Sequence, residues 1–411
     1  MRVEHLRVRG AEAVLVHEPA LPLVAVNVRI AAGSRDDPPG RHGLAHVVEH
    51  MTFSGTDGRA RGEHARLVEG MGGFLNARTS ADWTTYLHLV PADALAEVLT
   101  LEADRFSQIT TGFDETGLAA DREIVLRERD ERLSPAFGDA TATLLAGIHP
   151  APSPYSHLPV GDADHVRAVT VEDCRRFFSR HYVAPNVTMA VLGGFDPDRT
   201  RAGATRLLES FRDAPAVRRT AVPGGPRSPK QLRLELDGDH RSRVYLGVHL
   251  PPMSDPAAFD LARLGSVVLA RGTSGILTRL LVHERPVLQR LSLRTVPRRW
   301  DGSLGVLELV PLPGVTADRA VDAFDSAMEA LLRHGPEEAD ITRARAIHLS
   351  DRAAEDDSLI HRAANLTLAL QMHGVLDRHA GRIEAVDRDG FHRAIGLWHR
   401  PDDRVKAVYT R

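Results

Sequence analysis

The chain has 411 residues, of which 43% are hydrophobic and 26% are charged, so its length and composition suit two to three globular domains. Its formal net charge of −3 provides no positive field for nucleic acid or an anionic membrane. No apolar run is long enough to span a bilayer, and the N-terminus lacks the apolar core of a signal peptide. Cys174 is the single cysteine, which excludes an intrachain disulfide, and we expect a cytoplasmic protein with no membrane or nucleic-acid partner.

The first half of the chain predicts an alternation of strands and helices. Apolar alternation over residues 11–32 predicts two paired strands, and a polar loop leads from them to a helix that ends near Gly55. A helix at Glu63–Met71 is closed by Gly72 and Gly73. The pattern then predicts strands at Phe74–Ala77, Trp83–Val90 and Val187–Leu192, and helices at Ala92–Ser107, Asp114–Leu133 and Val171–Arg180.

A linker at residues 220–230, with three prolines and two glycines, separates this half from a second one. We therefore predict one domain at 1–219 and a degenerate repeat of it at 231–411. Short strands before long helices in each half predict an α+β fold, with each repeat a largely antiparallel sheet that carries helices on one face. The second half predicts strands at 232–236, 244–250 and 304–309, and helices at 256–271, 317–333, 336–356 and 360–373.

Three residues of the predicted helix before Gly55 are candidates for metal binding and proton transfer, namely His46, Glu49 and His50. The two histidines are four residues apart, so they share one face of a helix and can grip one zinc ion. Glu49 lies beside them, where it can take a proton from a zinc-bound water. His-x-x-Glu-His is the inverted order of the common zinc-peptidase motif. The alternative is a surface helix with two solvated histidines.

A catalytic zinc ion usually has three protein ligands, and the helix at Asp114–Leu133 offers the third. Glu128 and Asp121 are seven residues apart and share a face, so Glu128 can be the ligand and Asp121 a carboxylate that orients a ligating histidine. Spacing does not separate Glu128 from Glu123 or Glu131. The alternative is a solvated face of mixed charge.

The motifs together resemble the pitrilysin-type family of inverted-motif zinc peptidases, which includes mitochondrial processing peptidase and its bacterial relatives. The resemblance is strong over the first half of the chain and weak beyond it. It rests on His46-x-x-Glu49-His50, Gly33-Ser-Arg35, Gly72-Gly-Phe-Leu-Asn76-Ala77, Thr79 to Tyr86, Pro154-Tyr155, Pro159-Val-Gly161, Phe178…Tyr182…Pro185-Asn186 and Gly193-Gly-Phe-Asp196.

The resemblance implies roles for further residues. The family's third zinc ligand falls on Glu128, and its accessory glutamate falls on Asp121, whose shorter side chain is a departure. The family's substrate-side strand falls on Asn76 and Ala77, which implies that a peptide binds there as an added strand. The residues alone favour the alternative that Asn76 is a strand-end residue that makes a local side-chain bond.

A second departure concerns the partner. In active relatives the second half, or a partner subunit, contributes an Arg and a Tyr that bind substrate opposite the zinc ion. Val282 and Gln289 occupy those two places here, although Arg279 and Arg285 lie close by. The resemblance therefore implies a homologous partner subunit that supplies the Arg and Tyr, as a heterodimer first and a homodimer second.

Two functions follow from these residues. The first is a zinc metalloendopeptidase subunit that hydrolyses peptides or unfolded segments bound in extended form, with removal of a leader peptide as one option. The second is a non-catalytic scaffold or binding subunit of the same fold, because a fold does not fix a function.

Overall fold

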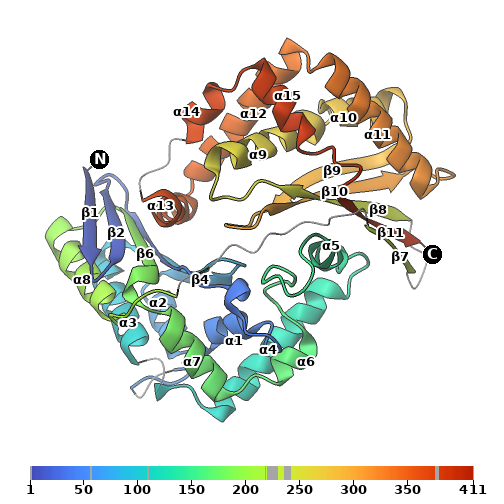
Figure 1. Cartoon of the computed structure of the whole chain (residues 1–411). Helices are drawn as coiled ribbons and strands as arrows, with labels where there is room; N and C mark the ends of the chain where they lie inside the picture. Colours follow the sequence, from blue (N-terminus) through green and yellow to red (C-terminus); the bar gives the residue numbers. More distant parts are fainter. Residues whose placement is uncertain are drawn as a thin grey trace. The chain divides into compact units, whose positions relative to one another are not determined.

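The computed structural model describes residues 2–55, 58–108, 111–217, 219, 230–235, 242–374 and 379–410. The chain forms two compact units (Figure 1). The first unit comprises Met1–Asp130, His157–Thr220 and Ala354–Asp377, and the second comprises Glu131–Ser156, Ala221–Ala353 and Arg378–Arg411.

These units differ from the predicted domains at 1–219 and 231–411 by two exchanged segments. Residues 131–156 belong to the second unit and residues 354–377 to the first, because each segment packs on the sheet of that unit. Apart from Lys230, the predicted linker at 220–230 lies outside the described residues.

A six-stranded sheet, in the order β1-β2-β6-β3-β5-β4, organises the first unit. Neighbouring strands are antiparallel except β2 and β6, which are parallel. Strand β4 lies at an edge of the sheet. The strands are β1 (Arg2–Val8), β2 (Ala11–His17), β3 (Leu23–Ile30), β4 (Phe74–Thr79), β5 (Thr84–Pro91) and β6 (Val187–Gly193).

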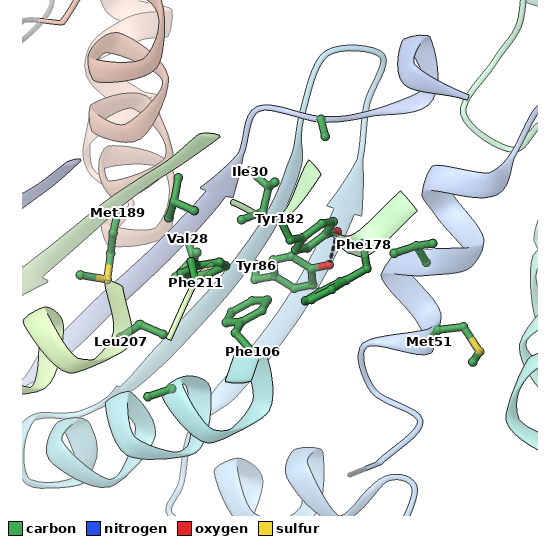
Figure 2. Packing of buried hydrophobic residues seen from close by; sticks show 14 of the residues in the cluster. Val28, Ile30, Met51, Tyr86, Phe106, Phe178, Tyr182, Met189, Leu207 and Phe211 are labelled. Carbon is green, nitrogen blue, oxygen red and sulfur yellow. Dashed lines mark hydrogen bonds between the residues drawn. The ribbon is translucent and has the colours of Figure 1, made fainter. Parts of the chain in front are cut away.

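One face of this sheet carries the main helical layer. Side chains of α1, α3, α4, α7 and α8 share a core with β2, β3 and β6. Within this core, the hydroxyl groups of Tyr86 and Tyr182 form a hydrogen bond of 2.7 Å among aromatic rings that include Phe106 and Phe178 (Figure 2). The helices of this part are α1 (Leu44–Met51), α2 (Glu63–Gly70), α3 (Leu95–Gln108), α4 (Glu115–Leu133), α6 (Ala163–Arg167), α7 (Val171–His181) and α8 (Pro197–Glu209).

The opposite face of the same sheet is covered by α13 (Leu359–His373), from the second half of the chain. Ala363 and Leu370 pack there against Val14 and Leu192. The continuous apolar runs of the central strands follow from this arrangement, because both faces of the sheet are buried.

The second unit contains a five-stranded sheet in the order β7-β11-β8-β10-β9, antiparallel except for the β7–β11 pair. Helix α5 contacts β8, β10 and β11, where Gly147 is required because a Cβ atom would lie 2.6 Å from a methyl group of Val405. The strands are β7 (Lys230–Glu235), β8 (Arg243–Leu250), β9 (Leu288–Val296), β10 (Ser303–Pro311) and β11 (Arg404–Thr410). The helices are α5 (Ala140–Ile148), α9 (Pro256–Ala270), α10 (Ile276–Thr278), the π-helical turn η5 (Arg279–Glu284), α11 (Ala317–His334), α12 (Glu338–Asp356), α14 (His379–Glu384) and α15 (Arg388–Gly396).

The predicted α+β fold of two similar units, each with a largely antiparallel sheet and packed helices, is confirmed. The structure also shows where two helices pack: α13 lies on the second face of the first sheet, and α5 lies on the second sheet. In the part of the chain that the structure describes, no helix combines the length and apolar character needed to cross a bilayer.

Candidate metal centre

Helix α1 places His46 and His50 one turn apart on one face. Val47 and Val48, on the other side, are fully buried in the core of the first unit. The helix follows Gly43, whose φ of +103° is a left-handed conformation that favours glycine. The two carboxylate oxygens of Asp37 accept hydrogen bonds from the backbone N–H groups of Gly43 and Ala45, at 2.7 and 2.8 Å. A buried carboxylate therefore provides acceptors for N–H groups at the start of α1, which have no acceptor within the helix.

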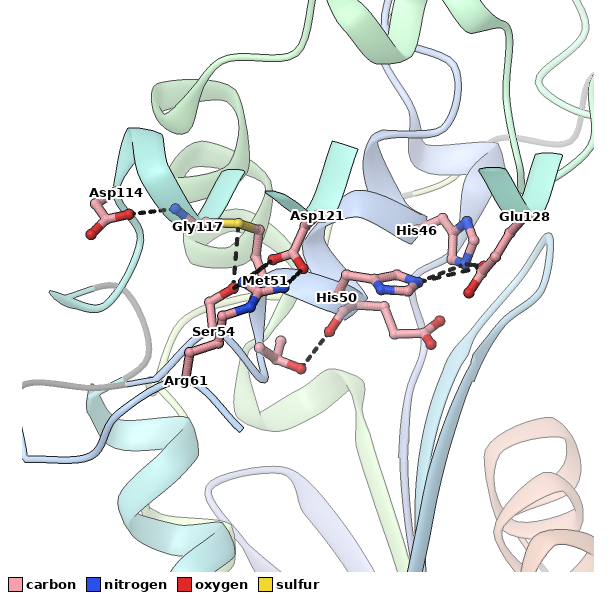
Figure 3. A network of polar contacts seen from close by, with 11 residues as sticks. His46, His50, Met51, Ser54, Arg61, Asp114, Gly117, Asp121 and Glu128 are labelled. Carbon is pink, nitrogen blue, oxygen red and sulfur yellow. Dashed lines mark hydrogen bonds and ion pairs between the residues drawn. The ribbon is translucent and has the colours of Figure 1, made fainter. Parts of the chain in front are cut away.

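Glu128 of α4 completes a group of three ligand-type side chains (Figure 3). Its Oε2 atom lies 3.3 Å from His46 Nε2 and 3.6 Å from His50 Nε2, and the two Nε2 atoms are 3.3 Å apart. Tetrahedral zinc with bonds of about 2.0–2.2 Å separates its ligand atoms by about 3.4 Å. The three side chains therefore fit one zinc ion.

The protonation states of these side chains also suit a metal ion. The hydrogen bond from His46, despite partial burial, lowers the pKa of Glu128 and favours its carboxylate form. Burial lowers the pKa of His50 and favours neutral imidazole. Carboxylate and neutral imidazole are the forms that bind a metal ion.

Glu49 turns its carboxylate toward the end of β4. Its side chain is almost fully buried, and the hydroxyl group of Thr79 donates a hydrogen bond to its Oε2 atom. Burial raises the pKa of Glu49, so this carboxyl group holds a proton more readily than a solvated glutamate does. A carboxylate with raised proton affinity beside three metal ligands has the properties of a general base.

The structure does not bring Asp121 into contact with a ligating histidine. Among the described residues, the buried Asp121 carboxylate accepts hydrogen bonds from Ser54 at 2.5 Å and from the guanidinium group of Arg61 (Figure 3). Asp121 thus ties the loop after α1 to α4, the helix that carries Glu128. The sequence alone does not reveal Arg61 as the partner of Asp121, because no periodic spacing relates this loop residue to α4.

Asn76 and Ala77 lie on the edge strand β4, and α1 contacts this strand. The Asn76 side chain is exposed, and its Oδ1 atom accepts the backbone N–H of Ala77 at 2.8 Å. This is the local side-chain bond that the alternative interpretation expected. The strand edge itself lies beside the helix that carries His46 and His50.

In the second unit, the two positions that the sequence resemblance aligns with the family's Arg and Tyr lie in different surroundings. Val282, in the π-helical turn η5, is partly buried and packs against the core of the unit. Gln289, in β9, is exposed. His283 and Glu284, which follow Val282, are also exposed.

Comparisons with known proteins identify the class. Residues 12–136 match the family profile described as Insulinase (Peptidase family M16), and residues 168–347 match the profile described as Peptidase M16 inactive domain. The two profiles together cover most of the chain, which therefore belongs to peptidase family M16. The resemblance stated from the sequence is confirmed.

Among curated relatives, an uncharacterized zinc protease of Mycobacterium leprae is 31% identical over 255 residues, which are 60% of this chain and 55% of that protein. A probable mitochondrial-processing peptidase subunit beta of Arabidopsis thaliana is 30% identical over 206 residues, or 49% of this chain and 38% of that protein. The chain spans about half the length of the curated relatives it matches. The crystal structure of a protease from Helicobacter pylori shares the fold, with a TM-score of 0.89 and 20% identity over 100% of this chain and 99% of that one.

Proposed function

We propose that this chain is a zinc metalloendopeptidase subunit that hydrolyses peptides or unfolded segments bound in extended form. The observation that carries the proposal is the convergence of His46, His50 and Glu128 at the separations that zinc requires, with Glu49 on the same helix. Membership of family M16 and the names of the relatives as zinc proteases support zinc as the metal.

Zinc held by these three side chains would polarise the scissile carbonyl as a Lewis acid and lower the pKa of a water molecule. Glu49 then accepts the proton of the attacking water, and its raised pKa favours this transfer. Thr79 donates to Glu49 and fixes the carboxylate beside the metal ligands. Asp121 acts at a distance, by holding the loop after α1 against α4.

The edge strand β4 supports a substrate in extended form. A peptide that adds as a strand to this edge gains main-chain hydrogen bonds with little demand on its sequence. Asn76 and Ala77 would contact such a peptide, after the Asn76 side chain releases the Ala77 N–H. Removal of a leader peptide is one substrate option, and the similarity to a processing-peptidase subunit supports it.

We further propose a homologous partner subunit that supplies an Arg and a Tyr to the substrate, as a heterodimer first and a homodimer second. Val282 and Gln289 cannot act as that pair, and the Arabidopsis relative is itself named as a subunit.

A cytoplasmic location is part of the proposal. Its support is that Cys174 is the single cysteine, which excludes an intrachain disulfide. Burial raises the pKa of the Cys174 thiol to about 12, so this side chain is an inert packed thiol.

A non-catalytic scaffold is the second candidate. Two observations favour it: the profile that matches the second half is described as an inactive domain, and the Arg and Tyr are absent from their expected places. The complete set of His46, Glu49, His50 and Glu128 opposes it, because a scaffold has no need of a base beside three metal ligands.

Replacement of Glu49 by Gln separates the two candidates. An endopeptidase should lose about 10²- to 10⁴-fold in peptide cleavage, the usual contribution of a general base, while it retains zinc. Cleavage of a peptide mixture is followed by mass spectrometry, and bound zinc by elemental analysis. Glu123→Gln, at an exposed position of α4, is the matched control and should cleave as the unmodified chain does. Unchanged cleavage by Glu49→Gln would reject the mechanism.

A further inference from the structure

A second group of ionisable side chains lies in the interior of the first unit. His64 of α2, His88 of β5 and Glu102 of α3 are all buried, and Arg105 follows one turn after Glu102. The Glu102 side chain is 0% exposed and that of Arg105 is 2% exposed. Nothing in the sequence motifs marks this cluster, and the proposed catalytic chemistry leaves it unused.

The Glu102 carboxylate lies at the centre of the cluster. Arg105 donates two hydrogen bonds to it, from Nε to Oε1 at 3.0 Å and from Nη2 to Oε2 at 2.5 Å. The Nε2 atoms of His64 and His88 lie 3.0 and 3.4 Å from Oε1. Bidentate pairing of this kind fixes the plane of the guanidinium group as well as its position.

A metal ion is the alternative occupant, because His64, His88 and Glu102 bring three ligand atoms together. Two features oppose it. The Arg105 charge already balances Glu102, so a divalent ion would leave two uncompensated positive charges in the interior. In addition, a closed structural zinc site usually has four protein ligands, and this cluster offers three.

The cluster connects instead to α1. Arg105 uses its remaining arm, Nη1, to donate a hydrogen bond of 3.1 Å to the Thr52 hydroxyl group. Thr52 follows the last residue of α1, and its hydroxyl group donates in turn to the backbone carbonyl of Glu49 at 2.6 Å. One hydroxyl group therefore bridges the buried ion pair and the last turn of the helix that carries Glu49 and His50.

The guanidinium group has no freedom to move away from this bridge. It lies over the rings of Phe53, Tyr86 and Phe106, at 4.7, 4.6 and 4.3 Å from their centroids. Cation–π contact in a desolvated site adds to the ion pair with Glu102. Arg105 is thus held by a carboxylate on one side and by aromatic faces around it.

We propose that Arg105, anchored by Glu102, is a positioning residue that fixes the C-terminal turn of α1 through Thr52, and with it His50 and Glu49 relative to Glu128. The inference rests on the proposed function of the His46, His50 and Glu128 group. Asp37 holds the other end of α1, so the helix is fixed at both ends by buried charged groups while its histidines face Glu128.

Thr52→Val tests the proposal, because it keeps the shape of the side chain and removes the bridging hydroxyl group. Thr52→Ser keeps the hydroxyl group and serves as the conservative variant. Thr367→Val is the matched control: Thr367 is a buried threonine whose hydroxyl group accepts from another buried arginine, Arg29, at 3.2 Å on the opposite face of the sheet.

Three readouts are compared on the full chain: the absorption spectrum of bound cobalt(II), zinc affinity by chelator competition, and kcat and KM for a peptide. Thr52→Val should bind zinc roughly tenfold more weakly, alter the cobalt spectrum and lower kcat more than it raises KM. Thr52→Ser and Thr367→Val should match the unmodified chain in all three readouts, even where Thr367→Val lowers the unfolding temperature. Arg105→Lys is a second variant and should behave as Thr52→Val does, since a lysine cannot hold both groups.

Two results would overturn the proposal. In the first, Thr52→Val and Arg105→Lys bind zinc and cobalt as the unmodified chain does. In the second, the His50→Ala chain still holds one tight zinc ion that is lost on adding His88→Ala, which would assign a metal to the buried cluster. Failure of the proposed function looks different, because the unmodified chain would then bind neither metal, or Glu49→Gln would cleave peptides normally.

Discussion

At the residue scale, the ion pair between Asp121 and Arg61 joins α4, the helix that carries Glu128, to the loop that follows α1. Asp121 is buried, and Arg61, which is partly exposed, is its charged partner. Arg61→Gln leaves the buried carboxylate without a countercharge, so we predict that the free energy of unfolding falls by about 1–3 kcal/mol. Urea unfolding measures the change.

The control for this variant is Arg66→Gln, at an exposed position of α2, which should change the free energy of unfolding by less than about 0.5 kcal/mol. Equal effects of the two substitutions would show that the ion pair does not stabilise the fold.

Asn76 offers a second prediction at this scale. If Asn76 contacts the substrate, Asn76→Ala should raise KM for a peptide about fivefold and leave kcat unchanged, the effect of one lost hydrogen bond. If the side chain serves only its local bond to the Ala77 N–H, the substitution frees that donor for the peptide and KM should fall. Steady-state kinetics distinguish the two results, and a fall in KM would contradict the role implied by the family.

The sequence predicts part of the metal centre for a physical reason. His46 and His50 lie in one short regular helix, so helical spacing alone places them together. Glu128 and Glu123 share one helix too, but only the position of α4 relative to α1 in their shared core decides which of them reaches the histidines. The partner of Asp121 was missed because Arg61 lies in a loop, where residue spacing carries no geometric information.

At the element scale, the ion pair between α11 and β11 makes the stability of the second unit depend on pH. Asp325 accepts two hydrogen bonds from Arg404, at 2.6 and 2.7 Å. Burial raises the pKa of Asp325, but Arg404 and then His399 outweigh it and hold the pKa at about 2. Because this value lies below that of an unfolded aspartate, about 3.9, the stabilisation is present above pH 4 and is lost as the pH falls toward 2.

We therefore predict that Asp325→Asn lowers the free energy of unfolding by about 2 kcal/mol at pH 7 and by much less near pH 2. Urea unfolding of both chains at several pH values gives the difference. A difference that does not change between pH 7 and pH 2 would show that ionisation of Asp325 contributes nothing.

Helices with strong apolar periodicity were predicted close to their observed bounds, as α7 and α11 illustrate. The prediction that the strands of residues 11–32 pair with each other was wrong, because β6 lies between β2 and β3 in the sheet. Strand β1 was not predicted because its side chains are largely exposed and carry no apolar alternation. The places of α5 and α13 could not be predicted either, since local periodicity shows that a helix has an apolar face and not which sheet it covers.

At the scale of the whole molecule, the proposed replacement of the family's Arg and Tyr by Val282 and Gln289 predicts that the chain is incomplete as a peptidase. Purified alone, it should bind zinc and cleave peptides slowly. A homologous partner with the Arg and Tyr but without His-x-x-Glu-His should restore cleavage, because it supplies the groups that hold the substrate. Pull-down from the native host with mass spectrometry identifies the partner, and light scattering gives the mass of the complex.

A fully active monomer would reject both forms of this prediction, whereas a fully active homodimer would reject only the obligate hetero-partner. Mutation of the partner's Arg or Tyr is the control. It should weaken cleavage and leave zinc bound at His46, His50 and Glu128.

The most direct measurement is the anomalous scattering of crystals grown with zinc, recorded on both sides of the zinc absorption edge. We predict one strong peak in the first unit, among His46 Nε2, His50 Nε2 and Glu128 Oε2, and none at His64, His88 and Glu102. The absence of a peak at the first group, or a peak at the buried cluster alone, would contradict the assignment of the metal centre and the mechanism built on it.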